Sequence, residues 1–395
     1  MTRWPLRHLD QIAKIYGGST PSRDNPSYWD GDIPWFTPTD LPVPDSGISI
    51  AETARERISQ LGLVNSSATM IPKGSILFSS RATIGKVAVA GLPLATNQGF
   101  VNFVPTPEID SRFLAYSLWH KRHEIARLSG STTFKEVSRA SIRRVQIEVP
   151  PLEEQERIVR ILDEADELRK LRAQADQKTA TLIPALFHQM FGDPASNPFD
   201  WPLICAGELM AHCEYGTSEK ANESGTGVPV LRMNNVTFDG RLNLASLKTV
   251  ELSSIERQKH SLASGDVLFN RTNSRELVGK TGMWDGQFEA VPASYFIRIR
   301  FDQAREHPHH FTTFMNLPFM KRRLASIARG AVGQANINSK ELRSLQVPVP
   351  PIDRQREFAA HVDEIESLYT GQTSNRTRLD DLFQSLLHRA FTGSL

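Results

Sequence analysis

The stretch Val149-Pro150-Pro151-Leu152-Glu153-Glu154-Gln155-Glu156-Arg157-Ile158 organises the whole chain, because it occurs twice. It returns 200 residues later as Val349-Pro350-Pro351-Ile352-Asp353-Arg354-Gln355-Arg356-Glu357-Phe358. The agreement extends outward to 141–147 with 341–347, to Trp4-Pro5-Leu6 with Trp201-Pro202-Leu203, and to 74–78 with 265–269. The offset drifts from 200 to 197 and 191, which indicates one scaffold carrying loops of different length. The sequence therefore predicts a tandem duplication.

Each half begins with about 150 residues in which short apolar runs alternate with Gly, Pro, Asn and Asp. This pattern predicts short strands joined by loops, for example at 75–79 with 86–90 and at 266–270 with 294–300. A helix is expected at 111–128. We therefore expect an α+β protein with two mixed α/β domains, at 1–150 and 193–348.

The last part of each half is different, because Pro-Pro fits a helix start and apolar residues then recur at alternating three- and four-residue steps. This spacing predicts two long helices, at 151–192 and 349–395, that pair antiparallel as a coiled coil about a pseudo-two-fold axis. A length of 30–35 residues gives about 45–50 Å per helix. Arg172 and Thr179 are polar members of the first stripe. The residues predicted at the subunit or helix interface are Ile158, Ile161, Ala165, Leu168, Leu182, Leu186, Phe358, Val362, Ile365, Leu368, Leu379, Leu382 and Leu386.

The net charge of +2 conceals an alternation along the chain. Lys plus Arg against Asp plus Glu number 17 against 13 in residues 1–150 and 6 against 10 in 151–200. The numbers are 18 against 14 in 201–348 and 5 against 7 in 349–395. Two mildly basic blocks separated by acidic ones are compatible with two modules that face nucleic acid, although many solvated surfaces vary as much.

Composition excludes several classes of protein. Hydrophobic residues make up 39% and charged residues 23%, as in globular proteins. Neither a signal peptide nor an apolar run long enough for a membrane span is visible, and Cys205 and Cys213 are too few for a disulfide framework. We expect a cytoplasmic protein.

Catalytic signatures are absent from the sequence. Gly279-Lys280-Thr281 ends like a phosphate-binding loop, but Ser274 stands where the first glycine belongs, and Ile84-Gly85-Lys86 fails in the same way at Ser80. His307-Pro308-His309-His310 has no second ligand cluster and is expected to be a loop rather than a metal site. We predict no catalytic residue, no metal site and no cofactor on this chain.

Two globular domains, each followed by a long helix that opens with Pro-Pro-x-x-x-Gln, resemble the specificity subunit of type I restriction–modification systems. The resemblance covers essentially the whole chain. It includes Gly18-Ser19-Thr20-Pro21-Ser22 with Ile33-Pro34-Trp35, the run 76–86, Val230-Leu231-Arg232-Met233-Asn234-Asn235 and the run 268–274. Asp353-Arg354 departs from the acidic pair of the first copy, which puts little in doubt.

The resemblance implies that each domain is a target-recognition domain that reads one half of a split DNA site. The helices would set the spacing of the half-sites and dock two modification subunits. Those partners would bring S-adenosylmethionine and adenine methylation, and two motor–nuclease restriction subunits would bring ATP and Mg. A spacer of this length would match about 13–15 base pairs.

DNA contacts require cations, hydroxyls and amides, so we select loop residues of these types. The segments 79–83 and 270–274 are expected at equivalent places just after a strand. Arg81 or Arg271 could fork onto a guanine there; the alternative is a polar turn whose arginine braces its own loop. Trp35 and Phe36 are expected in the core. The DNA-binding candidates are Ser19, Thr20, Ser22, Ser79, Ser80, Arg81, Thr83, Lys86, Asn97, Gln98, Lys220, Arg232, Asn234, Asn235, Asn270, Arg271, Thr272, Asn273, Ser274 and Lys280.

Three other interpretations stay open at this point. The chain could be a duplicated scaffold that joins protein partners without touching DNA, or a solitary specificity subunit of another DNA-modification defence system. An enzyme that itself methylates or cuts DNA is disfavoured by the missing motifs. A steep salt dependence of DNA affinity would separate a DNA-binding module from a scaffold.

Overall fold

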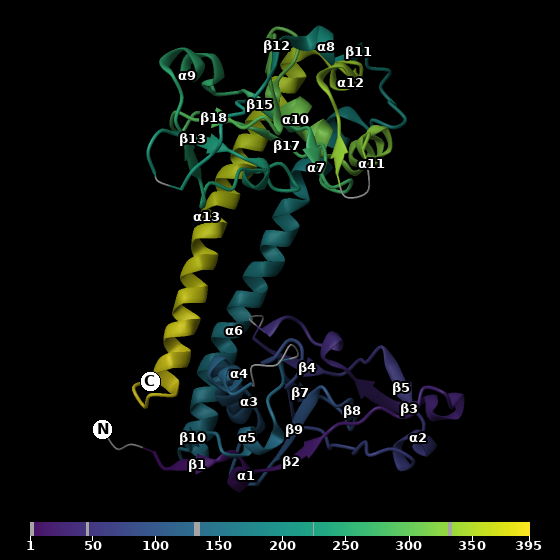
Figure 1. Ribbon diagram of the computed structural model, residues 1–395, viewed down its shortest axis with the longest axis vertical. Helices are drawn as coiled ribbons and strands as arrows, with labels where there is room; N and C mark the ends of the chain where they lie inside the picture. Colours follow the sequence, from purple (N-terminus) through teal and green to yellow (C-terminus); the bar gives the residue numbers. More distant parts are fainter. Residues whose placement is uncertain (1–3, 45–46, 130–134, 224, 331–333) are drawn as a thin grey trace. The chain divides into compact units, whose positions relative to one another are not determined.

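The computed structural model describes residues 4–44, 47–129, 135–223, 225–330 and 334–395. The chain divides into two compact units (Figure 1). Unit 1 comprises Met1–Ala173 and Ser374–Leu395, and unit 2 comprises Gln174–Thr373. Each unit thus contains one globular domain together with parts of both long helices.

Unit 1 is built on a five-stranded sheet of order β2-β9-β6-β7-β4, in which only β4 and β7 pair in parallel. A three-stranded sheet, β5-β3-β8, and the pair β1-β10 complete the strands. The strand bounds are β1 Leu6–His8, β2 Ala13–Gly17, β3 Trp29–Phe36, β4 Ile48–Ala51, β5 Glu56–Ile58, β6 Ile76–Ser79, β7 Val87–Ala90, β8 Ala95–Thr96, β9 Phe100–Pro105 and β10 Gln146–Glu148. The short helices are α1 Leu9–Ile12, α2 Gln60–Val64, α3 Ser111–His120, α4 Arg122–Arg127 and α5 Arg139–Arg143.

Unit 2 repeats this plan with a four-stranded sheet β12-β19-β15-β17, a three-stranded sheet β14-β13-β18, and the pairs β11-β21 and β16-β20. Its strands are β11 Leu203–Cys205, β12 Met210–Tyr215, β13 Val228–Leu231, β14 Lys248–Val250, β15 Val267–Asn270, β16 Thr272–Asn273, β17 Thr281–Met283, β18 Val291–Pro292, β19 Phe296–Phe301, β20 Ala335–Asn336 and β21 Gln346–Pro348. Its helices are α7 Leu182–Phe191, α8 Ala206–Leu209, α9 Ser254–His260, α10 Pro308–Asn316, α11 Pro318–Ile327 and α12 Ser339–Arg343.

The predicted duplication and strand pairs are confirmed. The predicted runs 75–79 and 86–90 form the antiparallel pair β6-β7, and 266–270 and 294–300 form the antiparallel pair β15-β19. The helix expected at 111–128 is present as α3 and α4, with a break at Lys121.

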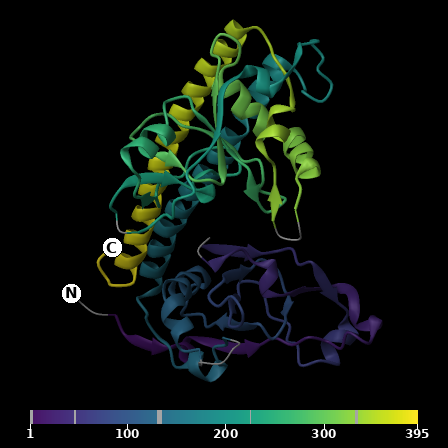
Figure 2. The ribbon, with the colours of Figure 1, turned by 45° about the horizontal axis from the view of Figure 1, so that its top comes forward.

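Alternation along the central strands gives each sheet two buried faces. In β15, Val267 and Phe269 belong to the larger core of unit 2, whereas Leu268 faces a second core around Trp284. Phe187 of α7 and Phe358 lie in the larger core, so both long-helix segments of unit 2 cover one face of the sheet (Figure 2). Unit 1 has the same two-sided construction.

The long helices are α6, Leu152–Ala180, and α13, Ile352–Ala390. The helix predicted over 151–192 is therefore interrupted at Thr181, and α7 follows as a separate helix. The end of α13 belongs to unit 1, where Phe383 lies 5.6 Å from the Trp119 ring. A segment that follows the second domain in sequence thus completes the core around α3.

The predicted antiparallel pairing is confirmed within each unit. In unit 1 the Arg169 Nε donates to Asp380 Oδ1 over 2.7 Å, and Arg157 donates to the Leu395 carbonyl over 3.2 Å. In unit 2 the Thr179 hydroxyl donates to Gln372 Oε1 over 3.0 Å. Partner numbers fall along one helix as they rise along the other, which is the signature of antiparallel helices.

Nine of the thirteen predicted seam residues are buried or half-buried, and the other four are displaced by one residue. Ile158, Ala165, Phe358 and Val362 are buried, and Ile161, Leu186, Ile365, Leu379 and Leu386 are half-buried. Leu168, Leu182, Leu368 and Leu382 are instead 45–61% exposed, and their neighbours Arg169, Ile183, Tyr369 and Phe383 point inward. The stripe takes a four-residue step where the prediction took three, because several true seam residues are polar and hydrophobicity could not reveal them.

Candidate nucleic-acid interface

Backbone hydrogen bonds bring separate loops of unit 1 together at one end of the five-stranded sheet. Ser19 N donates to the Thr96 carbonyl over 2.9 Å, and Ser80 N donates to the Gly99 carbonyl over 2.8 Å. The Thr20 hydroxyl donates to Gln98 Oε1 over 2.6 Å. These contacts gather candidates from three loops, together with the segment 135–139 described next. We call residues 17–20, 80–83, 97–99 and 135–139 the unit 1 edge.

Arg81 is the most accessible cation selected from the sequence on the unit 1 edge. Its Nε lies 2.7 Å from Glu136 Oε1, with both side chains close to 45% exposed. The backbone holds Glu136 in place, because Val137 N donates to the Ser80 carbonyl over 2.9 Å and Arg81 and Glu136 form a β-bridge. The 135–139 segment is thereby aligned beside the loop that carries Arg81.

Unit 2 forms the corresponding surface from equivalent segments. Thr217 N donates to the Pro292 carbonyl, Arg271 N to the Tyr295 carbonyl, and Ile337 N to the Arg271 carbonyl, over 2.7–2.9 Å. We call residues 215–218, 271–274, 293–295 and 335–339 the unit 2 edge. The duplication thus builds the same polar edge twice.

These bonds align the predicted segments 79–83 and 270–274 residue by residue. Ser80 and Arg271 accept from Val137 and Ile337 respectively, so the structural counterpart of Arg81 is Thr272. One residue of shift turns a strand side chain to the other face. Arg271 accordingly lies over the Tyr215 ring, with its guanidinium carbon 4.8 Å from the ring centroid, and donates to Asn336 Oδ1 over 3.1 Å.

At two pairs of equivalent positions, one edge carries a large side chain where the other carries a small one. In unit 1 the Arg139 guanidinium lies over Gly17, where a Cβ would be 3.0 Å from its nitrogen. In unit 2 Tyr215 occupies the position of Gly17, and its hydroxyl meets Ser339, the counterpart of Arg139, at 3.2 Å. The exchange gives the two edges different chemistry on one scaffold.

Lys86 and Lys280 have structural roles instead of the predicted DNA contact. The Lys86 ammonium donates to the Pro38 and Leu41 carbonyls over 2.6 and 2.7 Å, and Lys280 donates to the Met233 and Val236 carbonyls over 2.8 and 2.7 Å. Burial lowers the pKa of both lysines. Each lysine bonds a neighbouring 3₁₀ turn, Pro38–Asp40 or Met233–Asn235, to its sheet.

Other candidates are also inside the domains, because their polar atoms bond their own loop or a neighbouring segment of the same unit. Asn235 Nδ2 donates to the Asn243 carbonyl, and the Ser79 hydroxyl donates to the Thr83 carbonyl. The candidates buried in this way are Ser79, Ser80, Asn235, Asn270 and Thr272. For them the alternative of a self-bracing polar turn is the better interpretation.

The remaining candidates are accessible. Those half-buried are Ser19, Thr20, Asn97, Arg232, Arg271, Asn273 and Ser274, and those exposed are Ser22, Arg81, Thr83, Gln98, Lys220 and Asn234. Trp35 and Phe36 are buried, as predicted. The sequence analysis missed Glu136, Asn336, Tyr215 and Ser339. Glu136 and Asn336 stand 200 residues apart, the offset of the Pro-Pro motif, so the repeat contained a signal for them.

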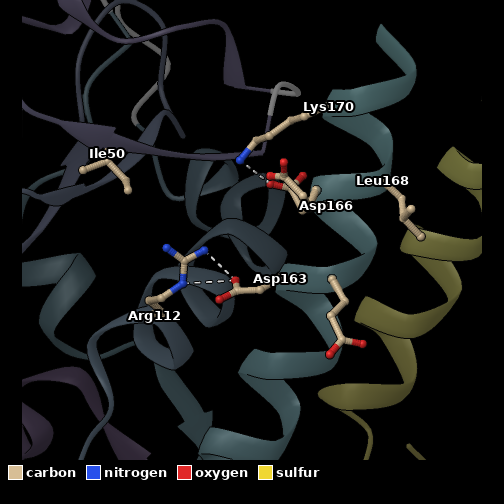
Figure 3. Close-up of a pocket in the computed structure, with 8 residues that line it drawn as sticks. Ile50, Arg112, Asp163, Asp166, Leu168 and Lys170 are labelled. Atoms are coloured by element: carbon tan, nitrogen blue, oxygen red, sulfur yellow. Dashed lines mark hydrogen bonds and ion pairs between the residues drawn. The ribbon is translucent and has the colours of Figure 1, made fainter. Parts of the chain in front are cut away.

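A separate hollow in unit 1 lies beside α6, between β4 and α3 (Figure 3). Two of its four carboxylates are engaged: Asp163 pairs with Arg112 and accepts from the Tyr116 hydroxyl over 2.8 Å, and Asp166 pairs with Arg169 and Lys170. Burial, followed by the Asp163 charge, raises the pKa of Tyr116. The other two carboxylates, Glu164 and Glu167, are exposed. The contacts of Asp163 therefore join α6 to α3 of the domain.

Comparison with known proteins matches the duplication. The family described as type I restriction modification DNA specificity domain matches residues 1–178 and again 199–377. The chain belongs to this family.

Relatives of this chain are named as specificity subunits of type I restriction enzymes. The type I restriction enzyme MjaIX specificity subunit of Methanocaldococcus jannaschii is 36% identical over 192 residues, 48% of this chain and 44% of that protein. The EcoKI specificity subunit of Escherichia coli K12 is 28% identical over 347 residues, 80% of this chain and 73% of that protein. The aligned part thus spans less than half of the first relative.

Solved structures of the family agree in fold. A chain from a study of complex assembly and conformational transition of the type I R-M system aligns with a TM-score of 0.60 at 18% identity, covering 100% of this chain and 99% of that one. The S subunit of a type I restriction–modification system from M. genitalium aligns with a TM-score of 0.58 at 14% identity, covering 98% and 96%.

Two searches within the described part of the chain found no further site. No cluster of three or more His, Cys, Asp or Glu side chains there is arranged to hold a metal ion. No helix in the same residues has the length and hydropathy required to cross a membrane.

Proposed function

We propose that this chain is a DNA-specificity subunit in which each unit reads one half of a bipartite duplex target. The observation that carries the proposal is the repeated edge: the same scaffold presents two accessible polar surfaces that differ in side chains. A split DNA site requires two readers of one shape and different chemistry. Family membership supports the same role.

The accessible side chains supply the donors and acceptors that duplex DNA requires. Arginines and amides suit base edges in the major groove, while hydroxyls, backbone amides and lysines suit phosphates. The unit 1 edge offers Ser19, Thr20, Arg81, Thr83, Asn97 and Gln98. The unit 2 edge offers Arg271, Asn273 and Ser274, and Ser22, Lys220, Arg232 and Asn234 would contribute from neighbouring loops.

The helices would set half-site spacing and dock two modification subunits. Leu168 on α6 and Leu368 on α13 occupy equivalent positions and are 51% and 61% exposed. An exposed leucine on each helix suits two copies of one partner. Those partners would bring S-adenosylmethionine and adenine methylation. Two restriction subunits would add ATP and Mg-dependent cleavage, so that this chain itself contributes binding and no catalysis in the cytoplasm.

The decisive experiment maps methylated adenines in the genome of cells that express this chain with its modification subunit, against cells that lack this chain. The expected result is a split motif with one modified adenine in each half, lost when the chain is absent. An unchanged pattern would contradict DNA reading and favour the protein scaffold, as would a DNA affinity without steep salt dependence.

An exchange of residues 1–150 with those of a relative tests the division of labour. The exchange should change one half of the methylated motif and leave the other half intact. A change in both halves would contradict independent reading by two units.

Substitutions of two leucines of α6, one exposed and one buried, test the docking surface. Leu168→Asp should weaken co-purification with the modification subunit while changing the unfolding free energy by no more than about 0.5 kcal/mol. Leu162→Ala removes a fully buried side chain and should cost about 2–5 kcal/mol. Unchanged assembly with Leu168→Asp would place the modification subunit elsewhere.

A further inference from the structure

The ion pair on the unit 1 edge leaves most of the arginine free for another partner. A guanidinium carries five N–H donors. Among the described residues, the one ion pair recorded for Arg81 is with Glu136, whose Oε1 lies 2.7 Å from the Arg81 Nε. No other contact to this side chain is found among the described residues. The two terminal nitrogens of Arg81 therefore remain available on a side chain that is 45% exposed.

Backbone contacts fix the position from which the Arg81 side chain extends. Arg81 and Glu136 are opposite each other in a β-bridge, and Val137 N donates to the Ser80 carbonyl over 2.9 Å. The next residue, Ala82, has a φ of +58°, in the left-handed region that non-glycine residues rarely adopt. Such backbone strain is concentrated at sites where a loop must present a side chain.

Stability does not explain the pair. An ion pair this exposed is screened by water and contributes little to the free energy of unfolding. What Glu136 does provide is direction, because a carboxylate beside Nε limits the rotamers of the side chain. The planar guanidinium itself fixes the geometry of the two terminal nitrogens, so limiting the rotamers aims both of them.

The equivalent positions of unit 2 carry a different pair. The counterparts of Arg81 and Glu136 are Thr272 and Asn336, which form a neutral hydrogen bond of 2.9 Å with Thr272 buried. Arg271 faces the Tyr215 ring instead. An exposed arginine paired through its Nε with a carboxylate does occur in unit 2, but at other positions, between Arg329 and Glu341 at 2.7 Å. The two halves therefore differ at the positions of Arg81 and Glu136.

We propose that Arg81, oriented by Glu136, reads a guanine in the half-site bound by unit 1. The inference rests on the proposed DNA-binding function and names a specificity-determining residue and its positioning residue. The terminal nitrogens of Arg81 donate to O6 and N7 of guanine in the major groove, the pattern that separates guanine from the other bases. Glu136 does not touch the base.

The test uses the full chain in complex with its modification subunit and duplexes that carry the mapped motif. Each base pair of the unit 1 half-site is replaced in turn, and affinity is measured. In the wild type, replacing one particular G·C pair should weaken binding about 10–100-fold. Arg81→Ala should abolish that preference, and Arg81→Lys should abolish it while retaining the charge.

Glu136→Ala should reduce the same preference about 3–10-fold and should add nothing to Arg81→Ala, since the two residues act as one unit. Arg127→Ala, which removes an exposed arginine of α4 outside the unit 1 edge, is the matched control and should leave the preference intact. Base preferences in the unit 2 half-site should be unchanged in every variant.

Three results would contradict the inference. Equal weakening on all duplexes by Arg81→Ala would make Arg81 a phosphate contact, and an unchanged preference would remove it from recognition. A wild-type preference in Glu136→Ala would contradict the positioning role. Failure of the proposed function itself is distinguishable, because no split methylated motif would then exist.

Discussion

Gln155 and Gln355, 200 residues apart in the sequence, make the same three hydrogen bonds in their own units. The Gln155 Oε1 accepts from Asp110 N, and its Nε2 donates to the Glu108 and Pro150 carbonyls. Gln355 has the same contacts with His307 N and with the Arg305 and Pro350 carbonyls. Both side chains are fully buried, so each glutamine joins the start of a long helix to the start of a domain helix.

Gln155→Ala should therefore destabilise unit 1 by about 2–3 kcal/mol, because three buried backbone groups lose their partner. Hydrogen exchange should accelerate in α3 and stay unchanged in α10, and Gln355→Ala should show the converse. Gln174→Ala, at an exposed position of α6, is the control and should change neither helix. Equal acceleration in both helices after a single substitution would contradict this local role.

Truncation after Thr373 should damage the unit that is remote in sequence. The removed segment contains Phe383, Leu387 and Ala390, which are buried in the core of unit 1. Losing several such side chains exceeds the stability of an ordinary domain. Limited proteolysis should cleave within 4–150 first. Leu382→Ala, at an exposed neighbour, should leave the digestion pattern unchanged, and first cleavage within 193–348 would contradict the shared core.

Glu306 and His310 form a fully buried polar pair, Oε1 to Nδ1 2.7 Å, where unit 1 has Ile109 and Phe113. Glu306→Ala should cost about 1–3 kcal/mol because His310 loses its partner. Glu306→Ile with His310→Phe copies unit 1 and should remain within about 1 kcal/mol of the wild type. Urea denaturation of both variants gives their free energies of unfolding. A double variant as unstable as Glu306→Ala would contradict the equivalence of the Glu306–His310 pair with Ile109 and Phe113.

The environment of Lys321 predicts that the stability of unit 2 depends on pH. Burial, followed by the Lys280 charge, lowers the pKa of Lys321 to about 7 from 10.5. Between these values the unfolded chain holds a proton that the folded unit lacks, so stability should rise with pH from about 7 to 10.5. Lys321→Met should flatten the rise in urea denaturation, whereas the exposed Lys340→Met should not. An identical slope in Lys321→Met would disprove the assignment.

Local pattern accounted for much of the architecture. Gln155 and its copy marked the duplication, and alternating apolar residues located β6, β7, β15 and β19, because strand and helix periods are recorded in neighbouring residues. Hydrophobic period also placed Ile158 and Phe358 in the helix contact. The hydrophobic period did not identify Arg169, which donates a hydrogen bond to Asp380 in the seam, because a polar residue carries no hydrophobic signal.

The candidate interface was less accessible to such reasoning. Residue type selected the loops of Arg81 and Arg271 as candidates, but it could not distinguish the exposed guanidinium of Arg81 from the buried ammonium of Lys280. Both are cations in polar loops. Their difference is the presence of two backbone carbonyls at Lys280, supplied by residues 44 and 47 positions away.

The duplication, the long helices and the family resemblance were thus contained in the sequence, since repeats and periodicity are properties of residue order. Folding settled two further matters: the end of α13 completes unit 1, and Glu136 holds Arg81. Each depends on contacts between residues distant in the chain, where a shift of one residue reverses the side of a strand or helix that is exposed.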